Sequence, residues 1–429
     1  MTDNIQDAYS RRLFLQQGVT LASMMATVPF FVERSAHAMM RPIGSLTTSQ
    51  AGVPEDRVLV VVQLGGGNDG LNTVIPYGND EYYRRRPSLG IKSPGKENGA
   101  LRIQGADGIG LHPNMTGLKE LMDEGVASIV QGVGYPNPNR SHFASMDIWH
   151  TADTSGKGYG WIGKYFDNTC NGTPEPQGGI AIGNQVPLAM NGSVQAPISF
   201  ESADAFRWAG QDLHRSLREP YDDITRAGSN QAVKSDTQMD FLMRTSLDAQ
   251  LASDRIRAAV AKATLVQYPG NRLAQQLKIV SAMIRDEMPT RVYYVSLGGF
   301  DTHANQGFQH GNLLSQLSQS LNAFYKDMKA QGNSKRVLTM VFSEFGRRVS
   351  QNASGGTDHG TAAPMYLVGD MLRPGLLGTH PSLKDLDNGD LKFNVDFRSI
   401  YTAVLQDWMK SPAAAILGQQ YQKPNLIRI

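Results

Sequence analysis

After residue 56 the chain alternates between two hydrophobic patterns. Short continuous runs of Val, Leu, Ile and aromatic residues are typical of strands buried on both faces of a parallel sheet. Longer segments with apolar residues three and four positions apart predict amphipathic helices. Their alternation predicts an α/β fold with a mostly parallel central sheet flanked by helices. The predicted strands are 57–64, 126–132, 291–297, 336–342 and 363–369, and the clearest predicted helices are 113–125 and 313–330.

Residues 57–429 show no internal repeat and no strong boundary, so we expect a single α/β domain. The stretch 235–288 has helical spacing without a strand signal, which predicts a helical insertion at about 205–290. Residues 39–56 are polar, contain Pro and Gly, and are interpreted as a linker.

The N-terminus carries three ordered elements of a targeting signal. The twin-arginine segment SRRLFL at 10–15 precedes a weakly apolar stretch at 18–31 and a small-x-small site, AHA, at 36–38. We therefore interpret 1–38 as a twin-arginine signal peptide and expect export of the folded protein, through the twin-arginine machinery, to the periplasm or outside the cell. The alternative is an exposed basic patch before an amphipathic helix. The apolar run is too short to span a membrane.

Charge and cysteine content narrow the chemistry. The net charge is +2, and basic residues do not cluster with aromatic ones, so nucleic acid is not an expected partner. The single cysteine, Cys170, excludes an internal disulfide and a cysteine-only zinc site. A metal ion would be held by Asp, Glu, His and hydroxyl groups, which suit hard or borderline divalent ions.

Polar side chains follow several predicted strands directly, where an open parallel sheet places its function. Together they could hold one or two divalent ions, with a hydroxyl group nearby as nucleophile. A helix start at 141–146 would also favour an anionic group. This combination suits hydrolysis of a phosphate or sulfate ester. The candidates are Asp69, Asp301, His303, Glu344, Asp358 and His359, with Ser141 or Ser145 as the hydroxyl.

Each candidate taken alone has a structural interpretation as well. An Asp after a Gly-rich stretch, such as Asp69, is more often a turn or helix-cap residue. Glu344 could pair with Arg347 or Arg348. The histidines outside the strand ends are divided: His112 and His142 stay open candidates, and His150 and His310 are interpreted as structural or exposed.

Five motifs carry a resemblance to a known family: LGGGNDGLNTVIPY, NRSHFASMDIW, GYGWIGKYFD, YYVSLGGFDTHANQ and VFSEFGRRVSQNASGGTDHGTAAPMYLVG. The chain resembles an uncharacterised group of twin-arginine-exported, sulfatase-like bacterial proteins within the alkaline phosphatase/sulfatase superfamily. The resemblance covers nearly the whole mature chain. It implies an alkaline-phosphatase-like fold, and the group has no settled activity to carry over.

The resemblance also implies roles for individual residues. Asp69 matches the metal-binding Asp after the first strand, and Ser141 is the nearest match to the nucleophile at a helix start. Asp301 and His303 resemble the next ligand pair, and His359 resembles a late histidine ligand. The sulfatase signature Cys/Ser-x-Pro-x-Arg is absent, so a formylglycine-dependent sulfatase is not expected.

The sequence departs from the superfamily at one corner. Glu344 and Phe345 stand where an Asp-His pair normally ends a strand, so one imidazole is missing unless Asp358 or His142 replaces it. Asn68 is a further possible ligand. The change would weaken a two-zinc site most. The number of ions, one or two, and their identity, Zn, Mg, Mn or Ca, stay open, as does a degenerate, non-catalytic site.

The leading hypothesis is an exported, metal-dependent hydrolase acting on an anionic ester, in which Ser141 is the nucleophile or a further ligand and Arg347 clamps the oxyanion. The substrate would be a phosphate or sulfate ester, with a polysaccharide or cell-surface component as one option. The competing hypothesis is a non-catalytic binding or scaffold protein that retains a degenerate site. A serine esterase is disfavoured because no Gly-x-Ser-x-Gly motif occurs. The expected metal ligands are Asp69, Asp301, His303, Glu344 and His359.

Overall fold

The computed structural model describes residues 57–169, 176–194, 197–202 and 253–428. The predicted signal peptide and linker, and most of the predicted insertion, lie outside these described residues. The chain divides into two compact units, residues 1–42 with 200–261 and residues 43–199 with 262–429. All of the candidate site residues belong to the second unit.

A nine-stranded sheet, in the strand order β11-β5-β10-β9-β1-β8-β6-β7 with β14 paired to β5, forms the centre of the described fold. The strand β1 runs parallel to both of its neighbours, and β10 runs antiparallel to β9 and β5. The strands are β1 (Val58–Gly65), β5 (Ala127–Gly134), β6 (Gly179–Ile182), β7 (Ile198–Phe200), β8 (Val292–Gly298), β9 (Val337–Ser343), β10 (Ala363–Val368), β11 (Gly375–Leu377) and β14 (Val395–Asp396).

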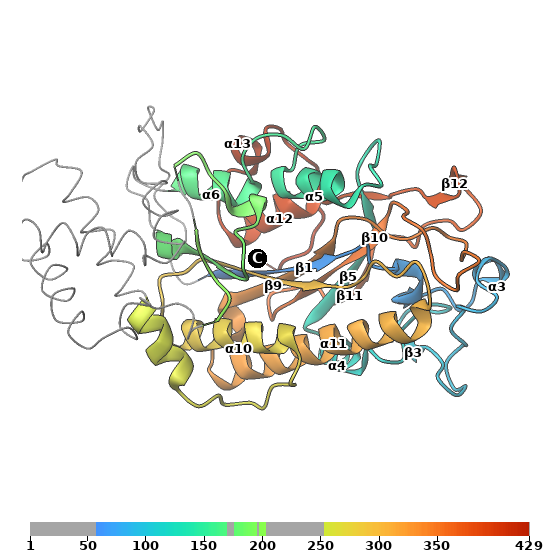
Figure 1. The fold of residues 1–429 in the computed structure, drawn as a ribbon, viewed down its shortest axis with the longest axis horizontal. Helices are drawn as coiled ribbons and strands as arrows, with labels where there is room; N and C mark the ends of the chain where they lie inside the picture. Colours follow the sequence, from blue (N-terminus) through green and yellow to red (C-terminus); the bar gives the residue numbers. More distant parts are fainter. Residues whose placement is uncertain (1–56, 170–175, 195–196, 203–252, 429) are drawn as a thin grey trace, which may run out of the picture. The chain divides into compact units, whose positions relative to one another are not determined.

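Helices cover both faces of this sheet (Figure 1). One layer contains α5 (His142–Thr151), α6 (Trp161–Thr169), α12 (Phe397–Ala403) and α13 (Ala413–Leu417). The other contains α4 (Thr116–Asp123), α10 (Arg272–Arg285) and α11 (Gln306–Ala330).

The continuous apolar run of β1 follows from this three-layer arrangement. Successive side chains of a strand point to opposite faces of the sheet. When both faces are covered, the residues of both alternating sets must therefore be apolar. Leu59 and Val61 pack in the same core cluster as Trp149 of α5 and Tyr401 of α12, whereas Val60 and Val62 are buried outside that cluster. The predicted α/β class and the mostly parallel sheet are confirmed.

The reversed direction of β10 matters for the site. Because β10 is antiparallel to β9, its first residue lies at the edge where β9 ends. The loop before β10 is joined to the segment after β9 by backbone hydrogen bonds from Arg348 N to Asp358 O and from Gly346 N to Thr361 O, at 3.0 and 2.8 Å. The Asp358-His359 corner is thereby held against the carboxyl ends of the parallel strands.

Smaller elements lie around the sheet. A three-stranded sheet has the order β2-β4-β3, and β12 pairs with β13. In the described parts of the chain, no helix is both long and apolar enough to cross a membrane. The bounds are β2 (Val74–Ile75), α3 (Asp80–Arg85), β3 (Leu101–Arg102), β4 (Gly110–Leu111), β12 (Leu386–Asp387) and β13 (Asp390–Leu391).

Candidate metal centre

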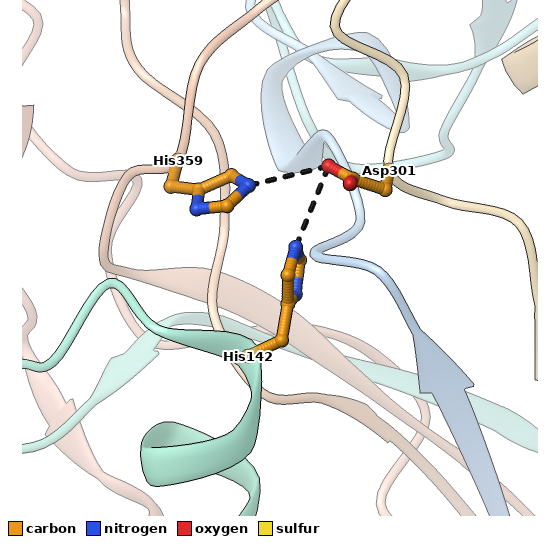
Figure 2. Close-up of side chains that lie close together, drawn as sticks. All are labelled: His142, Asp301 and His359. Carbon is orange, nitrogen blue, oxygen red and sulfur yellow. Dashed lines mark hydrogen bonds and ion pairs between the residues drawn. The ribbon is translucent and has the colours of Figure 1, made fainter.

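Three side chains from distant parts of the sequence meet at the carboxyl edge of the sheet (Figure 2). His142 is the first residue of α5, Asp301 follows β8, and His359 lies in the loop before β10. The Asp301 Oδ1 atom is 3.2 Å from His359 Nε2 and 3.4 Å from His142 Nε2. One ligand atom from each of the three residues lies within 4.8 Å of the others, so the three side chains could hold a metal ion.

A third imidazole, that of His303, lies beside this group. Its Nε2 atom is 3.0 Å from Asp301 Oδ1 and 2.9 Å from His359 Nε2. Three imidazole Nε2 atoms therefore face one carboxylate oxygen.

The other nitrogen of each ring is held by a separate acceptor. A neutral imidazole has one N–H, and an oxygen acceptor at Nδ1 places that hydrogen on Nδ1. The three Nε2 atoms are then left with their lone pairs directed at one another and at the carboxylate. The pairs are His142 Nδ1 with Glu344 Oε1 at 2.7 Å, His359 Nδ1 with the Arg140 carbonyl at 2.8 Å, and His303 Nδ1 with Asp358 Oδ1 at 3.2 Å.

This arrangement fits a divalent cation. Lone pairs converging on a carboxylate repel one another unless a positive charge lies between them. A tetrahedral ion with ligands at about 2.0–2.1 Å places the ligand atoms about 3.3 Å apart. Within the cluster the separations to Asp301 Oδ1 are 3.0, 3.2 and 3.4 Å. The His142 Nε2 atom is buried and has no hydrogen-bond partner among the described residues.

Asp301 is anionic across the physiological pH range. Burial alone would raise its pKa, but the hydrogen bond from Arg347 and the positive charge of that guanidinium oppose burial, and the pKa is lowered to about 2. The neighbouring His142 is affected in the opposite sense, because its hydrogen bond to Glu344 raises its pKa. A proton is therefore the competitor of a metal ion at His142.

Arg347, the expected oxyanion clamp, is buried beneath the cluster. Its Nε donates to the carbonyl of Gly67 and its Nη1 to that of Thr357, both at 2.8 Å. Its Nη2 donates to Asp301 Oδ1 at 2.7 Å and to the carbonyls of Gly66 and Phe300. The guanidinium thus ties the loop after β1 to the loop after β8.

Glu344, an expected ligand, faces the Nδ1 side of His142. Its Oε1 also accepts from Gly66 N at 2.8 Å, and its Oε2 accepts from Ser343 Oγ at 2.9 Å. The adjacent Phe345 packs its ring against two imidazoles, with centroid distances of 4.8 Å to His142 and 5.1 Å to His359. The phenyl group therefore supports the rings at the corner where an imidazole was expected.

The structure places Asp69 in a second, fully buried cluster. Its carboxylate pairs with Arg86 and accepts from Gln306 Nε2. Burial would raise the pKa of Asp69, but Arg86 lowers it. Asn68 lies nearby and its Oδ1 accepts from His310 Nε2 at 2.9 Å. Neither Asp69 nor Asn68 joins the group formed by the imidazoles. Nothing in the sequence marks Arg86 or Gln306 as a partner of Asp69.

The two candidate hydroxyl groups differ in exposure. Ser141 is exposed, precedes His142 as the N-cap of α5, and makes no side-chain cap hydrogen bond there. Ser145 is buried and its Oγ donates to the Glu344 carbonyl at 2.6 Å. Of the two, Ser141 is the one that a substrate at the cluster could reach.

The fold and this cluster define the class of the molecule: an α/β protein with a candidate metal centre at the carboxyl edge of its sheet. Within that class, the chain belongs to the family described as "Protein of unknown function (DUF1501)", which matches residues 56–410. No protein with a curated description matches the chain.

Solved structures with a similar fold include a protein in the alkaline phosphatase superfamily from Vibrio parahaemolyticus, with 7% identity, a TM-score of 0.39 and coverage of 92% of this chain and 78% of that one. The lipoteichoic acid synthase LtaP from Listeria monocytogenes has 8% identity, a TM-score of 0.34 and coverage of 80% and 73%. Ps i-CgsB in complex with k-i-k-neocarrahexaose has 10% identity, a TM-score of 0.33 and coverage of 85% and 73%. At these values the similarities do not define an activity or a ligand.

Proposed function

We propose that the protein is an exported, metal-dependent hydrolase of an anionic ester, either a phosphate or a sulfate ester. The observation that carries the proposal is the convergence of imidazole Nε2 atoms on Asp301 Oδ1 while each Nδ1 is bound to another acceptor. Such a set of neutral donors and one carboxylate is suited to a divalent cation. When bound, the ion would polarise the ester and offset the negative charge that develops on its oxygens.

The residues around the cluster have separate tasks in this proposal. Asp301 and the imidazoles hold the ion, and their positions are fixed by contacts on the side away from it. Ser141 lies at the start of α5, where free backbone N–H groups and the helix dipole favour the oxygens of an anionic group. Its exposed hydroxyl is the proposed nucleophile, or else a group that binds the ester.

Export and substrate class rest on the sequence. The twin-arginine signal at 1–38 supports transport of the folded protein to the periplasm or the cell exterior. A protein in that compartment meets anionic esters on polysaccharides and on cell-surface components, which we propose as the substrate class.

The test is metal analysis of the protein purified from a host with twin-arginine export, combined with turnover of an aryl phosphate and an aryl sulfate. We expect bound metal, hydrolysis of at least one ester, and loss of both in Asp301→Ala and His359→Ala. His380→Ala, which changes a histidine outside the cluster, is the matched control and should retain both.

Two outcomes would contradict the proposal. Unchanged activity in Asp301→Ala and His359→Ala would remove the cluster from the reaction. Stoichiometric metal without turnover of any ester would favour the non-catalytic binding protein instead.

A further inference from the structure

The ligand set and the number of ions can be inferred from the contacts around the cluster. We infer that the centre holds a single ion on four protein ligands, and that Glu344 is a positioning residue for His142 and not a ligand. This inference rests on the proposed metal dependence. Three of the four ligand atoms, Asp301 Oδ1 and the Nε2 atoms of His142 and His359, form the group that lies within 4.8 Å. The fourth is His303 Nε2, which is added because it lies 3.0 Å from Asp301 Oδ1 and 2.9 Å from His359 Nε2.

The contacts of both ring nitrogens of His303 place this residue in the ligand set. Its Nε2 is nearer to Asp301 Oδ1, at 3.0 Å, than the Nε2 of either other histidine. Its Nδ1 is engaged with Asp358 Oδ1 at 3.2 Å, so the ring presents an unprotonated Nε2 to the cluster. Asp358 thus orients His303 in the way that a carboxylate orients a metal-binding histidine.

Glu344 cannot share the ion that His142 binds through Nε2. The two nitrogens of an imidazole point in divergent directions, and Glu344 accepts from Nδ1. The carboxylate is itself fixed by Gly66 N and by the Ser343 hydroxyl, and the residue is 1% exposed. A buried, triply anchored carboxylate of this kind fixes the tautomer of the imidazole and increases its basicity as a ligand.

The charge distribution below the cluster leaves no role for a second ion at Asp69. Both Asp69 and Arg86 have fully buried side chains, and the guanidinium lies on the carboxylate. Arg86 is held in place by Asn72 Oδ1, the Val349 carbonyl and the Arg348 carbonyl at 2.8, 2.9 and 2.8 Å. A metal ion at Asp69 would have to displace a cation from a carboxylate that is itself fully buried, which is strongly unfavourable. Asp301 also pairs with a guanidinium, that of Arg347, but its side chain is 49% exposed and can take an ion from the open side.

A second guanidinium, that of Arg347, begins a chain of hydrogen bonds that runs from Asp301 to Asp69. Arg347 donates to Asp301 Oδ1 and to the carbonyl of Thr357, whose hydroxyl donates to Gln306 Oε1. Gln306 in turn donates to Asp69. This chain of hydrogen bonds connects the cluster to the Asp69 ion pair through protein groups.

The donor set also selects among metals. Three imidazole nitrogens and one carboxylate suit Zn²⁺, whereas Mg²⁺ and Ca²⁺ prefer oxygen ligands. The Asp301 side chain is 49% exposed, which leaves a direction of approach open to a substrate oxygen. Zinc sites can expand to five ligands when a substrate enters.

The experiment uses the full chain, stripped of metal and titrated with Zn²⁺ and with Co²⁺ as a spectroscopic probe. We expect one ion per chain, a Co²⁺ absorption spectrum of the tetrahedral type, and an affinity for Zn²⁺ that falls about 10–100-fold in Glu344→Gln with the stoichiometry unchanged. Asp358→Asn should have a smaller effect because Asp358 is more exposed to solvent. The control Glu120→Gln changes a half-exposed carboxylate on α4 and should bind Zn²⁺ as the wild type does.

Circular dichroism and thermal unfolding of the metal-free variants separate a ligand effect from a folding defect. If Glu344→Gln does not fold, Asp358→Asn and His303→Ala provide the same comparison at the exposed side of the cluster. Any stoichiometry other than one, an octahedral Co²⁺ spectrum, or an unchanged Zn²⁺ affinity in Glu344→Gln would overturn the inference. One bound ion without ester hydrolysis would overturn the proposed function alone, and two bound ions with hydrolysis would overturn this inference alone.

Discussion

Replacing Arg347 by Met decides whether this residue acts as a clamp for the substrate or as a structural tie. Its side chain is fully buried, and its donors reach the carbonyls of Gly67 and Thr357 and the carboxylate of Asp301. Methionine matches only the aliphatic part of arginine and has no donors, so the variant leaves these acceptors unpaired. A substrate clamp would instead need guanidinium N–H groups directed at the ester.

The size of the effect follows from these contacts. A buried polar group that loses its partner costs about 1–3 kcal/mol. The Asp301 side chain is 49% exposed, so solvent screens the charge that it would leave behind. We therefore expect Arg347→Met to lower the free energy of unfolding by about 2–6 kcal/mol, which is about 1–3 kcal/mol for each of the buried carbonyls of Gly67 and Thr357, with little added by the screened ion pair. Arg347→Lys keeps the charge but fewer of the hydrogen bonds, and should show an intermediate loss.

The assay is urea-induced unfolding of the metal-free protein, followed by circular dichroism, for the wild type and both variants. Metal-free protein is required because a bound ion would add its own stabilisation. A loss below about 1 kcal/mol in Arg347→Met, together with a large fall in ester turnover, would refute the structural role and restore the clamp. Equal stability of the Met and Lys variants would show that the retained charge contributes little and that the hydrogen bonds lost in both variants carry the effect.

Three further predictions test other parts of the molecule. Ser141→Ala should lower turnover at least about 100-fold, the scale for losing an activated nucleophile or a transition-state donor, while Zn²⁺ affinity stays unchanged. Saturating Zn²⁺ at 100 times its dissociation constant should raise the free energy of unfolding by about 2.7 kcal/mol, measured as a higher urea midpoint, and a chelator should reverse the rise. Burial lowers the pKa of His150 to about 4, below the value of about 6.5 in an unfolded chain. The unfolded state therefore binds more protons below pH 6.5, and His150 alone should account for a loss of about 2 kcal/mol between pH 7 and pH 5 in the metal-free protein, measured as the difference between the wild type and His150→Gln.

The sheet and the position of the site could be predicted from the sequence for a physical reason. A strand covered on both faces must be apolar throughout, so the apolar runs at 57–64 and 336–342 predict strands, and β1 and β9 lie within one residue of them. The helix expected at 313–330 begins earlier, at Gln306, because its first turns include His310 and Gln306, which are buried against polar partners and break the apolar spacing.

The direction of each side chain could not be predicted in this way. The end of a strand fixes where a residue lies but not which neighbour it contacts. Asp69 and Glu344 both follow strands, yet one pairs with Arg86 and the other with His142. Arg86 is 17 positions away from Asp69, in a run of arginines whose other members have exposed side chains, and the sequence does not distinguish it.

The start of α5 carries both His142, a proposed metal ligand, and Ser141, the proposed nucleophile. Phe345 occupies the corner after β9 and packs against His142, so the imidazole absent from that corner is provided by a helix instead. Ser141 is the N-cap of α5, and His142 is the first residue of the helix. The hydrogen bond between Glu344 and His142 therefore holds both a proposed ligand and the start of the helix that carries the proposed nucleophile. A loosened Glu344 contact should weaken metal binding and displace Ser141 from the ion at the same time, because one rigid element carries both groups.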